Sequence, residues 1–339
     1  MDRAARTVKT LLTGASGFIG RRLAARLQTV HPEANLRCLV KTQDDPFCES
    51  GACFLRSRSL RTIATDLVTG QGLRNLPDHD LIFHLAANTH TWERDHQCND
   101  RGTEHLLQAL GPLGPNNHIV FTSTTAVMDN REDLKTLLQP QPSVRRPPLS
   151  RYGLSKWRAE EFLRGEAREQ GFRLSIVRLC TVYGPDPRPN TLFDVLKRKV
   201  ASRSLVSRLN WPGLTSFIHV EDVATCLLKV ADDPPEPGEA RTYLLATESK
   251  TLADVAQLLY RARGLAYKMI CLPMTAWRLM RNVHRFCRLS AGRLPTFLFN
   301  QIWRFNMVVN PVFHCDTTCM SQWFPNLQPR LMADCIHEI

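Results

Sequence analysis

A tyrosine and a lysine four positions apart are the side chains best suited to proton transfer. Tyr152 and Lys156 stand in the run YGLSK, and on a helix residues i and i+4 share a face, so the ammonium group reaches the neighbourhood of the phenol. An unperturbed tyrosine has a pKa of about 10. A cation at about 4 Å in an effective dielectric near ~20 is worth roughly 4 kcal/mol, which would lower that pKa by about three units. The phenol would then exchange protons near neutral pH.

A hydroxyl group is expected next to this pair. Residues 118–124, HIVFTST, are typical of a buried strand that ends in Ser123 and Thr124. The Thr124 hydroxyl is suited to hydrogen-bond the oxygen of a reacting carbonyl or alcohol, while Tyr152 transfers the proton and a nicotinamide transfers the hydride. The three side chains therefore predict hydride-transfer chemistry, provided that the chain also holds a dinucleotide.

A glycine-rich loop near the N-terminus predicts a binding site for a dinucleotide pyrophosphate. The run TGASGFIG, from Thr13 to Gly20, lies between an apolar strand pattern and an amphipathic helix pattern. Gly14 permits the tight turn, Gly17 lets the backbone approach the phosphates, and Gly20 lets the helix pack closely on the strand. The pyrophosphate would bind the free N–H groups at the helix start. Three glycines alone also fit an ordinary strand-to-helix turn, so the interpretation depends on the later motifs.

The end of the second predicted strand bears on which dinucleotide is preferred. Residues 35–40 form that strand, and Lys41 follows it, with Arg37 nearby. An acidic residue at this end would hold the ribose hydroxyls of NAD, whereas a basic residue accommodates the extra phosphate of NADP. No carboxylate stands at Val40 or Lys41, so the sequence favours NADP over NAD. A solvated surface lysine is the alternative interpretation.

The remaining pattern predicts an α/β fold. Apolar strands alternate with helices at the interval of parallel βαβ units, which are covered on both faces and bind ligands at the carboxyl ends of the strands. We expect a doubly wound parallel (Rossmann) sheet that binds the dinucleotide in residues 1–184, with residues 217–247 returning to it. A smaller, mostly helical C-terminal lobe, from residues 185–216 and 248–339, is expected to bind the substrate.

Two segments are less regular. Residues 42–61 are polar and rich in cysteine without a clear period, which predicts a loop or an irregular helix. Residues 174–183, LSIVRLCTVY, predict one continuous strand.

The composition is that of an ordinary globular protein and narrows the classes of partner. Of 339 residues, 43% are apolar, and neither a membrane-spanning run nor a secretory leader is indicated, so a cytoplasmic location is the default expectation. The eleven cysteines include no CxxC pair and no zinc-type spacing, which predicts reduced thiols and no metal site. The formal charge of +12 suits an anionic partner. No nucleic-acid motif is present.

The last part of the chain changes in character. Residues 273–288 and 295–305 combine aromatic and aliphatic side chains at helical spacing with several arginines. Such a pattern usually marks a core face. A lid over a hydrophobic substrate and a helix at an anionic membrane surface are the alternatives, so peripheral membrane contact stays open.

Together the motifs resemble the extended short-chain dehydrogenases, the NAD-dependent epimerase/dehydratase family. The resemblance rests on TGASGFIG, Asp66-Leu67, HLAA, NDRGT, FTST, YGLSK, VYGP and FIHVEDVA, and covers residues 7–247 in order. It implies a catalytic triad of Thr124, Tyr152 and Lys156. It also implies that Asn99 supports the active site and that Lys156 reaches the nicotinamide ribose. With Lys41 added, the residues expected around the cofactor are Gly14, Ser16, Gly17, Phe18, Ile19, Gly20, Lys41, Asp66, Leu67, Ala86, Ala87, Asn99, Tyr152 and Lys156.

Departures from the family pattern narrow the expected chemistry. Sugar dehydratases and decarboxylases of the family need acidic residues just after the catalytic hydroxyl, whereas residues 125–127 are Thr, Ala and Val. Thr181 stands where many sugar epimerases have Asn, and Thr215-Ser216 stand where an Arg often grips a sugar-nucleotide phosphate. Dehydration and decarboxylation are therefore disfavoured, and a UDP-sugar substrate is in doubt.

Three functions follow, in order of preference. The first is an NAD(P)-dependent oxidoreductase that interconverts a secondary alcohol and a ketone of a small-molecule substrate, with Tyr152 as proton donor or acceptor. The second is a nucleotide-sugar epimerase that uses the same triad with tightly bound NAD. The third is a non-catalytic cofactor-binding or membrane-associated structural subunit, which the intact triad disfavours. A homodimer is compatible with each.

Overall fold

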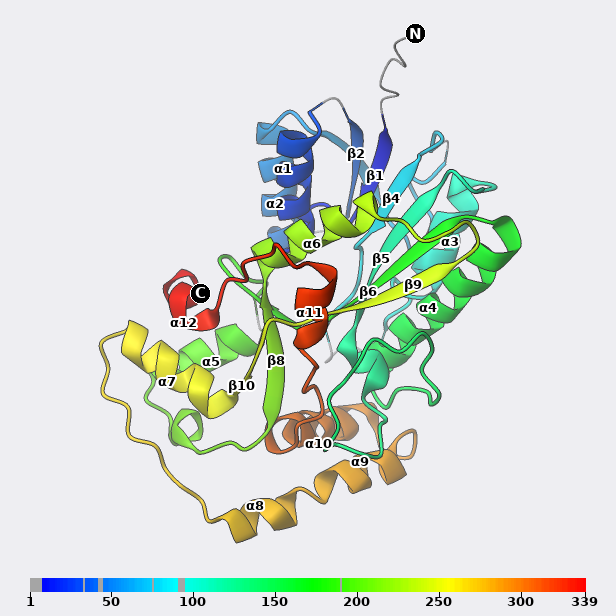
Figure 1. Cartoon of the computed structure of the whole chain (residues 1–339). Helices are drawn as coiled ribbons and strands as arrows, with labels where there is room; N and C mark the ends of the chain where they lie inside the picture. Colours follow the sequence, from blue (N-terminus) through cyan, green and yellow to red (C-terminus); the bar gives the residue numbers. More distant parts are fainter. Residues whose placement is uncertain (1–7, 33, 42–44, 75, 91–94, 190) are drawn as a thin grey trace.

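The computed structural model describes residues 8–32, 34–41, 45–74, 76–90, 95–189 and 191–339. A seven-stranded sheet with the order β3-β2-β1-β4-β5-β6-β9 forms its centre (Figure 1), and its neighbouring strands are all parallel. The strands are β1 Lys9–Thr13, β2 Asn35–Lys41, β3 Arg61–Thr65, β4 Leu81–His84, β5 His118–Thr124, β6 Arg173–Leu179 and β9 Ala240–Leu245. The order reverses between β1 and β4, where a doubly wound sheet opens a crevice.

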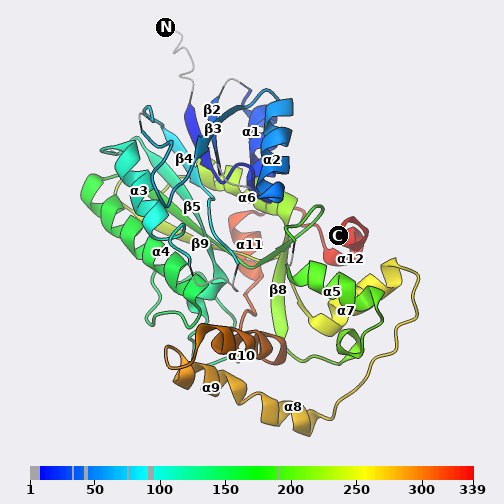
Figure 2. The same cartoon turned by 180° about the vertical axis from the view of Figure 1, so that it is seen from behind.

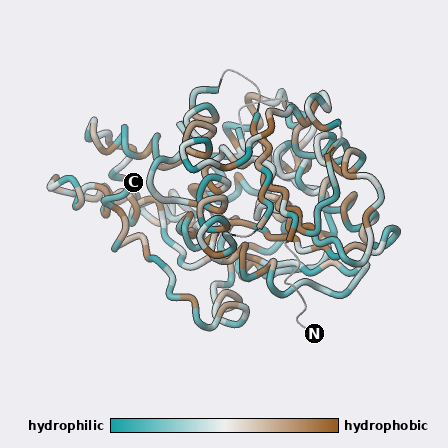
Figure 3. The backbone as a smooth tube through the Cα atoms, turned by 90° about the horizontal axis from the view of Figure 1, so that it is seen from above, coloured by the Kyte–Doolittle hydropathy of each residue, from teal (hydrophilic) through white to brown (hydrophobic). Residues whose placement is uncertain are grey.

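Helices cover both faces of this sheet. On one face lie α1 Gly20–Val30, α2 Pro46–Ser57 and α6 Val220–Asp232, which share one apolar core. On the other lie α3 Arg101–Leu110 and α4 Arg151–Gln170, which share a second core. Successive residues of β1 and β5 alternate between these cores, as the pleat requires. Brown, apolar segments of the backbone gather toward the middle of the molecule in Figure 3. The prediction of a doubly wound Rossmann sheet is confirmed.

The chain changes sheets after β6. Residues 174–183, expected as one strand, divide at Cys180 into β6 and β7 Thr181–Tyr183. Strand β7 belongs to a second sheet of order β10-β8-β7, with β8 Leu214–His219 and β10 Glu248–Thr251. The apolar run is continuous because β6 is largely buried and β7 is buried or partly buried, and hydropathy alone cannot reveal a change of partner strand.

A helix also replaces one expected irregular segment. Helix α2 begins after Asp45, whose carboxylate accepts the amide of Phe47, and Pro46 occupies its first turn. Aspartate before proline is a normal helix start, and it was the available signal within residues 42–61.

The second sheet carries the remaining helices. Helices α5 Leu192–Ala201, α7 Leu252–Ala262 and α12 Met332–Cys335 surround a third apolar core. Helices α8 Met274–Met280, α9 Val283–Ser290 and α10 Thr296–Val309 lie at the end of the molecule away from the N-terminus (Figures 1 and 2), and α11 Thr318–Trp323 follows. Short 3-10 turns are η1 Thr125–Met128, η2 Leu205–Arg208 and η3 Ile336–Glu338. The region is mostly helical, as expected, and the domain limits drawn from the sequence stay a prediction. Among the described residues, none of the helices has both the length and the apolar character needed to span a bilayer.

Candidate active site

The glycine loop between β1 and α1 has no room for side chains at two of its glycines. Gly14 has a φ of +66°, and a Cβ there would lie 2.7 Å from the Ala86 nitrogen. A Cβ on Gly20 would lie 2.1 Å from the Gly14 carbonyl oxygen. No side chain caps α1, and the amides of Phe18 and Ile19 have no backbone acceptor among the described residues. This cradle of open amides at a helix N-terminus fits a pyrophosphate.

A buried hydrogen-bond chain fixes the loop to its neighbours. Thr13 Oγ1 accepts two successive amides, including that of Ala86, and lies 2.8 Å from His84 Nδ1. His84 Nε2 lies 2.9 Å from Thr103 Oγ1, which donates to the Asn99 carbonyl oxygen. These contacts assign the His84 hydrogen to Nε2, and burial lowers the pKa of His84 to about 3. His84 is therefore a neutral structural residue, as its strand position predicts.

Helix α4 presents Tyr152 and Lys156 to the end of β5. The side chains of Tyr152 and Thr124 are hydrogen bonded, and Lys156 Nζ donates to the Thr122 carbonyl oxygen at 2.9 Å. Glu160, one turn further along, forms a fully buried ion pair with Arg178 of β6, with Nη2 and Oε2 2.6 Å apart. Side chains four residues apart thus contact successive points of the sheet. The structure brings the three predicted catalytic residues to one place.

The electrostatics of this group differ from expectation. Burial raises the pKa of Tyr152 to about 12, and the hydrogen bond with Thr124 offsets only part of that rise. Burial also lowers the pKa of Lys156 to about 8. The expected lowering of the Tyr152 pKa by Lys156 is wrong for this structure, because the ammonium group faces the Thr122 carbonyl and the Phe121 ring, 4.5 Å from its centroid.

Asn99 joins the loop after β4 to the catalytic helix. Its Oδ1 accepts the Asn88 amide, and its Nδ2 donates to the Asn88 carbonyl and to Ser155 Oγ. Ser155 in turn donates to the Tyr152 carbonyl oxygen. Asn99 is fully buried, and both of its amide hydrogens bind protein atoms. These contacts make it a residue that positions α4.

The expected adenosine end of the site lies at the carboxyl ends of β2 and β3. Lys41 is exposed, is in register with Thr65, and forms no hydrogen bond or ion pair with the described residues. Asp66 Oδ1 accepts the amide of Val68 in its own turn, and Leu67 is buried against Gly102. Of these side chains, Lys41 is the one directed to solvent. Thr42, the expected strand end, lies outside the described residues.

Three residues in and around α4 make contacts that the sequence did not indicate. The His96 ring lies 5.9 Å from the Tyr152 ring. A Cβ on Gly153 would lie 2.4 Å from the Ala126 carbonyl oxygen, so this glycine lets α4 approach η1. Arg178, the buried partner of Glu160, stands in an apolar strand. His96 lies in an aperiodic loop, and the other two depend on contacts between distant segments.

Asp129 is a further residue that the sequence did not single out. It is fully buried, and its carboxylate accepts the amides of Leu149 and Ser150, just before α4, and Trp303 Nε1 of α10 at 2.9 Å. Burial raises the pKa of Asp129 to about 6. The carboxylate thus joins the start of the catalytic helix to the C-terminal helices.

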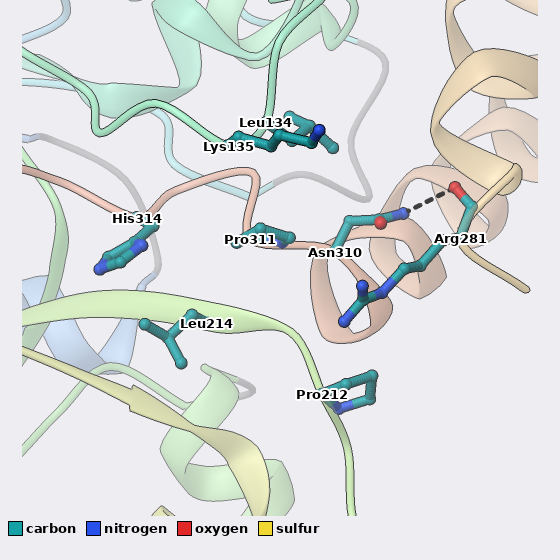
Figure 4. Close-up of a pocket in the computed structure, with 8 residues that line it drawn as sticks. All are labelled: Leu134, Lys135, Pro212, Leu214, Arg281, Asn310, Pro311 and His314. Atoms are coloured by element: carbon teal, nitrogen blue, oxygen red, sulfur yellow. Dashed lines mark hydrogen bonds between the residues drawn. The ribbon is translucent and has the colours of Figure 1, made fainter. Parts of the chain in front are cut away.

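A cavity of about 330 Å³ lies in the C-terminal region (Figure 4). Burial and Arg131 lower the pKa of His314, so Lys135 and Arg281 supply the positive charge of its lining. The lining residues come from the loop after η1, the start of β8, and the segments around α8 and α10. They are Leu134, Lys135, Pro212, Leu214, Arg281, Asn310, Pro311 and His314.

The aromatic residues of the last region divide into two groups. Trp277, Phe299 and Trp303 are 1%, 6% and 4% exposed and belong to the interior, whereas Phe297 and Phe305 reach the surface. None of the five lines the described cavity.

One cluster of metal-binding side-chain types forms through the fold. Ligand atoms of His219, Cys335 and Glu338 lie within 4.8 Å of one another, which no spacing in the sequence indicated. However, His219 Nδ1 accepts the Glu221 amide, so the ring hydrogen is on Nε2, 3.3 Å from Glu338 Oε2. Nε2 in that tautomer is a hydrogen-bond donor and offers no lone pair to a cation. The contact is a histidine–carboxylate pair.

Comparisons with known proteins identify the family of the chain. A profile of the NAD dependent epimerase/dehydratase family matches residues 10–246. A UDP-glucuronic acid 4-epimerase structure from Bacillus cereus, in complex with UDP-glucuronic acid and NAD, superposes with a TM-score of 0.73 over 97% of each chain at 18% identity. At that identity the likeness concerns the fold alone.

Curated relatives differ in their reactions. A 4-hydroxy-2-methyl-3-oxo-4-farnesyl-3,4-dihydroquinoline-1-oxide ketoreductase of Stigmatella aurantiaca is 27% identical over 87% of both chains. An N-acetyl-alpha-D-glucosaminyl-diphospho-ditrans,octacis-undecaprenol 4-epimerase of Escherichia coli O157:H7 is 31% identical over 56% of this chain and 53% of the relative. The chain spans only 4% of a matching hybrid PKS-NRPS synthetase, tasS of Hapsidospora irregularis.

Proposed function

Because the chain belongs to the NAD dependent epimerase/dehydratase family, a family of NAD-dependent enzymes, we propose that it is an NADP(H)-linked oxidoreductase that interconverts a ketone and a secondary alcohol. The observation that carries the proposal is the hydrogen-bonded pair of Thr124 and Tyr152 at the end of β5, with Lys156 one turn along α4.

The dinucleotide binds along the carboxyl edge of the sheet. The amides at the start of α1 hold its pyrophosphate, Leu67 and Asp66 flank the adenine, and Lys41 pairs with the 2′-phosphate of NADP. Lys41 suits this role because it is exposed at the end of β2 and has no acidic partner among the described residues. The backbone at Ala86 and Ala87 lies against the bound cofactor beside Gly14. The bound cofactor supplies or accepts the hydride.

In the reducing direction, Tyr152 donates its phenolic proton to the ketone oxygen. A Tyr152 pKa of about 12 keeps the phenol protonated at neutral pH, which suits a proton donor. Thr124 hydrogen-bonds the same substrate oxygen and orients it. Lys156 contacts the nicotinamide ribose, and Asn99 holds the first turns of α4 through Ser155. The reverse reaction returns the proton from the alcohol to the Tyr152 oxygen.

The first acidic side chain after Thr124 is not available for dehydration. Asp129 is fully buried, and its carboxylate accepts hydrogen bonds from Leu149, Ser150 and Trp303. An elimination reaction needs an acid beside the leaving group. Because the Asp129 carboxylate is buried in these hydrogen bonds, it is not available as that acid, which supports oxidoreduction over dehydration.

Thr215 and Ser216 stand where the family resemblance implies a contact with a sugar-nucleotide phosphate, and another segment of the chain covers them. Ser216 Oγ accepts the Cys315 amide at 2.8 Å, and Thr215 is bridged to Phe313. Both side chains are buried under that segment. This packing disfavours a UDP-sugar held in the way that the resemblance implies.

We further propose a substrate that carries a long apolar chain. The ketoreductase and the undecaprenol epimerase described above both have prenyl groups in the names of their substrates. The cavity adds apolar surface from Leu134, Leu214 and two prolines beside Lys135 and Arg281. Such a lining accepts an apolar chain next to an anionic or polar group.

A lipid-linked sugar epimerase is the second candidate function. The charged side of the same cavity favours it, because Lys135 and Arg281 suit a diphosphate. Epimerisation uses the same Tyr152 and Thr124 but returns the hydride to the opposite face of the keto intermediate, so that NAD stays bound.

The test uses the purified full chain with NADPH or NADH and a prenylated ketone. We expect loss of the reduced nicotinamide absorbance with an equal amount of alcohol formed, faster with NADPH, and loss of that reaction in Tyr152→Phe. Tyr183→Phe is the matched control, because its hydroxyl binds Glu248 and the Arg330 carbonyl away from β5. The result that would favour the epimerase over the reductase is tightly retained NAD, with sugar epimerisation and no net consumption of the nicotinamide cofactor.

A further inference from the structure

One stretch of the chain is basic and lacks acidic residues altogether. From residue 255 to residue 315 there are nine lysines and arginines and no aspartate or glutamate, although the chain contains 32 acidic residues. Helices α8, α9 and α10 lie within this stretch. A one-sided charge distribution of this kind favours an anionic partner.

The same helices expose large apolar side chains. Leu279 is 75% exposed, Phe297 67% and Leu289 59%, which are among the highest values for apolar side chains in the described residues. We call the following set the α8–α10 face: the exposed apolar residues Leu279, Phe286, Leu289, Phe297 and Leu298, with the exposed arginines Arg278, Arg285 and Arg293.

Within α9, apolar and cationic side chains lie together on the outer side of the helix. Arg285, Phe286 and Leu289 are at positions i, i+1 and i+4, so they point outward together, while His284 and Cys287 face the interior. On α10, Phe297 and Leu298 point outward and Phe299 inward. Each helix therefore has a separate inner core face, and the outer apolar side chains are surplus to packing.

The three helices lie together at one end of the molecule. Figures 1 and 2, seen from opposite sides, both place α8, α9 and α10 at the end away from the N-terminus. The acidic residue that reaches α9 is Glu132, which pairs with Arg288 and with Arg146. Arg278, Arg285 and Arg293 form no ion pair with any described residue, so their charges remain for a partner.

We propose that the α8–α10 face docks on an anionic membrane surface, with the apolar side chains inserted among the lipids and the arginines at the headgroups. Mixed apolar and cationic side chains on surface helices are the composition that suits an anionic interface. A second copy of the chain fits less well, because pairing this face with itself would bring arginines together without acidic residues. Duplex nucleic acid fits the charges but not the exposed leucines.

Docking in this orientation would bring the described cavity close to the membrane. Arg281, in the turn between α8 and α9, is exposed and also lines the cavity. The cavity therefore adjoins the end of the molecule that meets the membrane. This consequence rests on the proposed substrate class, whereas docking itself is measured without substrate or cofactor.

The test is flotation of the purified full chain with vesicles of phosphatidylcholine alone or of equal parts phosphatidylcholine and phosphatidylglycerol. We expect binding to the anionic vesicles that weakens as salt is raised to about 0.5 M. Arg285→Glu should weaken binding about tenfold or more. Phe286→Ser with Leu289→Ser should weaken it about a hundredfold.

Matched variants control for exposure and charge. Lys199→Glu reverses an exposed charge on α5, and Leu205→Ser with Val206→Ser removes apolar side chains that are 66% and 50% exposed elsewhere. Both should bind like the unchanged protein, and all variants should keep its melting temperature. No binding to anionic vesicles, equal loss in the controls, or self-association abolished by the α9 double variant would each overturn the proposal. Oxidoreductase activity without vesicle binding would leave the proposed function standing alone.

Discussion

The predicted catalytic region buries charged side chains, whereas the α8–α10 face exposes apolar ones. Around β5 and α4, the buried Arg178 and Glu160 form an ion pair, and the buried Lys156 donates to the Thr122 carbonyl oxygen. On the α8–α10 face, Leu279 and Phe297 are exposed beside arginines that form no ion pair with the described residues. Both departures from ordinary burial are costly for an isolated domain.

The difference shows where the reason for each departure lies. The buried charges of Lys156, Glu160 and Arg178 are explained inside the chain, because each contacts a backbone or side-chain group of the same chain. The exposed apolar side chains have no such internal reason, and the proposed membrane contact would supply one. The comparison can be tested by changes that act inside one region and leave the other unaffected.

The largest effect is expected from Tyr152→Phe. Removing the hydroxyl deletes proton transfer and the contact with Thr124, so hydride transfer should slow by about 10² to 10⁴ with little change in cofactor affinity. Single-turnover nicotinamide absorbance measures the rate. A rate near that of the unchanged protein, with Tyr183→Phe as control, would remove Tyr152 from the mechanism.

Alanine substitutions at two glycines should have opposite effects on stability, because a Cβ clashes with the backbone at one position and has open space at the other. A Cβ on Gly20 meets the Gly14 carbonyl at 2.1 Å, so Gly20→Ala should destabilise the loop by several kcal/mol, on the order of other large steric effects, and weaken cofactor binding. Gly165, in the middle of α4, has open space around it, so Gly165→Ala should stabilise by about 0.5–1 kcal/mol. Chemical denaturation of both variants decides the signs. Equal effects would mean that the loop adapts.

These residues also show how much the sequence could predict. The Rossmann sheet could be predicted because strand and helix periods alternate. The proximity of Thr124, Tyr152 and Lys156 could be predicted because the spacing of residues on a helix and the end of a strand are local patterns. Asp129 and Arg178 were not readable, since each depends on a partner from a distant segment. The change of sheets at Cys180 could not be predicted either, because β6 and the partly buried β7 form one uninterrupted, mostly apolar run.

The carboxylate between the two regions predicts a pH effect on stability. Asp129 has a pKa raised to about 6 in the folded protein, against an ordinary value of 3.8, so the folded state keeps the proton longer. Stability from this group is present below pH 3.8 and is lost as pH rises through about 6. The loss is up to about 3 kcal/mol.

Asp129→Asn removes the titration while keeping the size of the side chain. The free energy of unfolding of the variant, minus that of the unchanged protein, should therefore rise by about 3 kcal/mol between acidic and neutral pH. Changed hydrogen bonds would shift this difference equally at every pH. Urea denaturation of both proteins across this range measures the difference. A difference independent of pH would show that Asp129 does not titrate there.

A smaller effect is expected at the adenosine end of the site. Lys41→Asp replaces an exposed cation with a carboxylate, which should repel the 2′-phosphate and accept ribose hydroxyls. The binding free energy of NADPH relative to that of NADH should become less favourable by roughly 1–3 kcal/mol, the scale of a charge-assisted contact. Titrating both cofactors into both proteins tests this. An unchanged ratio would leave Lys41 as a solvated charge and return NAD to equal standing.

The smallest effect on stability is expected on the α8–α10 face itself. Phe297 and Phe299 are two residues apart on α10, yet Phe297 is 67% exposed and Phe299 is 6% exposed. Phe299→Ala opens a cavity in the core and should cost about 3–5 kcal/mol. Phe297→Ala should change the free energy of unfolding by less than about 0.5 kcal/mol. Thermal unfolding of the two variants, alone and with anionic vesicles, compares the regions directly. If Phe297 serves a membrane contact, its variant should unfold like the unchanged protein in buffer but gain less stability from vesicles. A large loss in buffer would instead mean that Phe297 packs against the chain and that the face is part of the protein core.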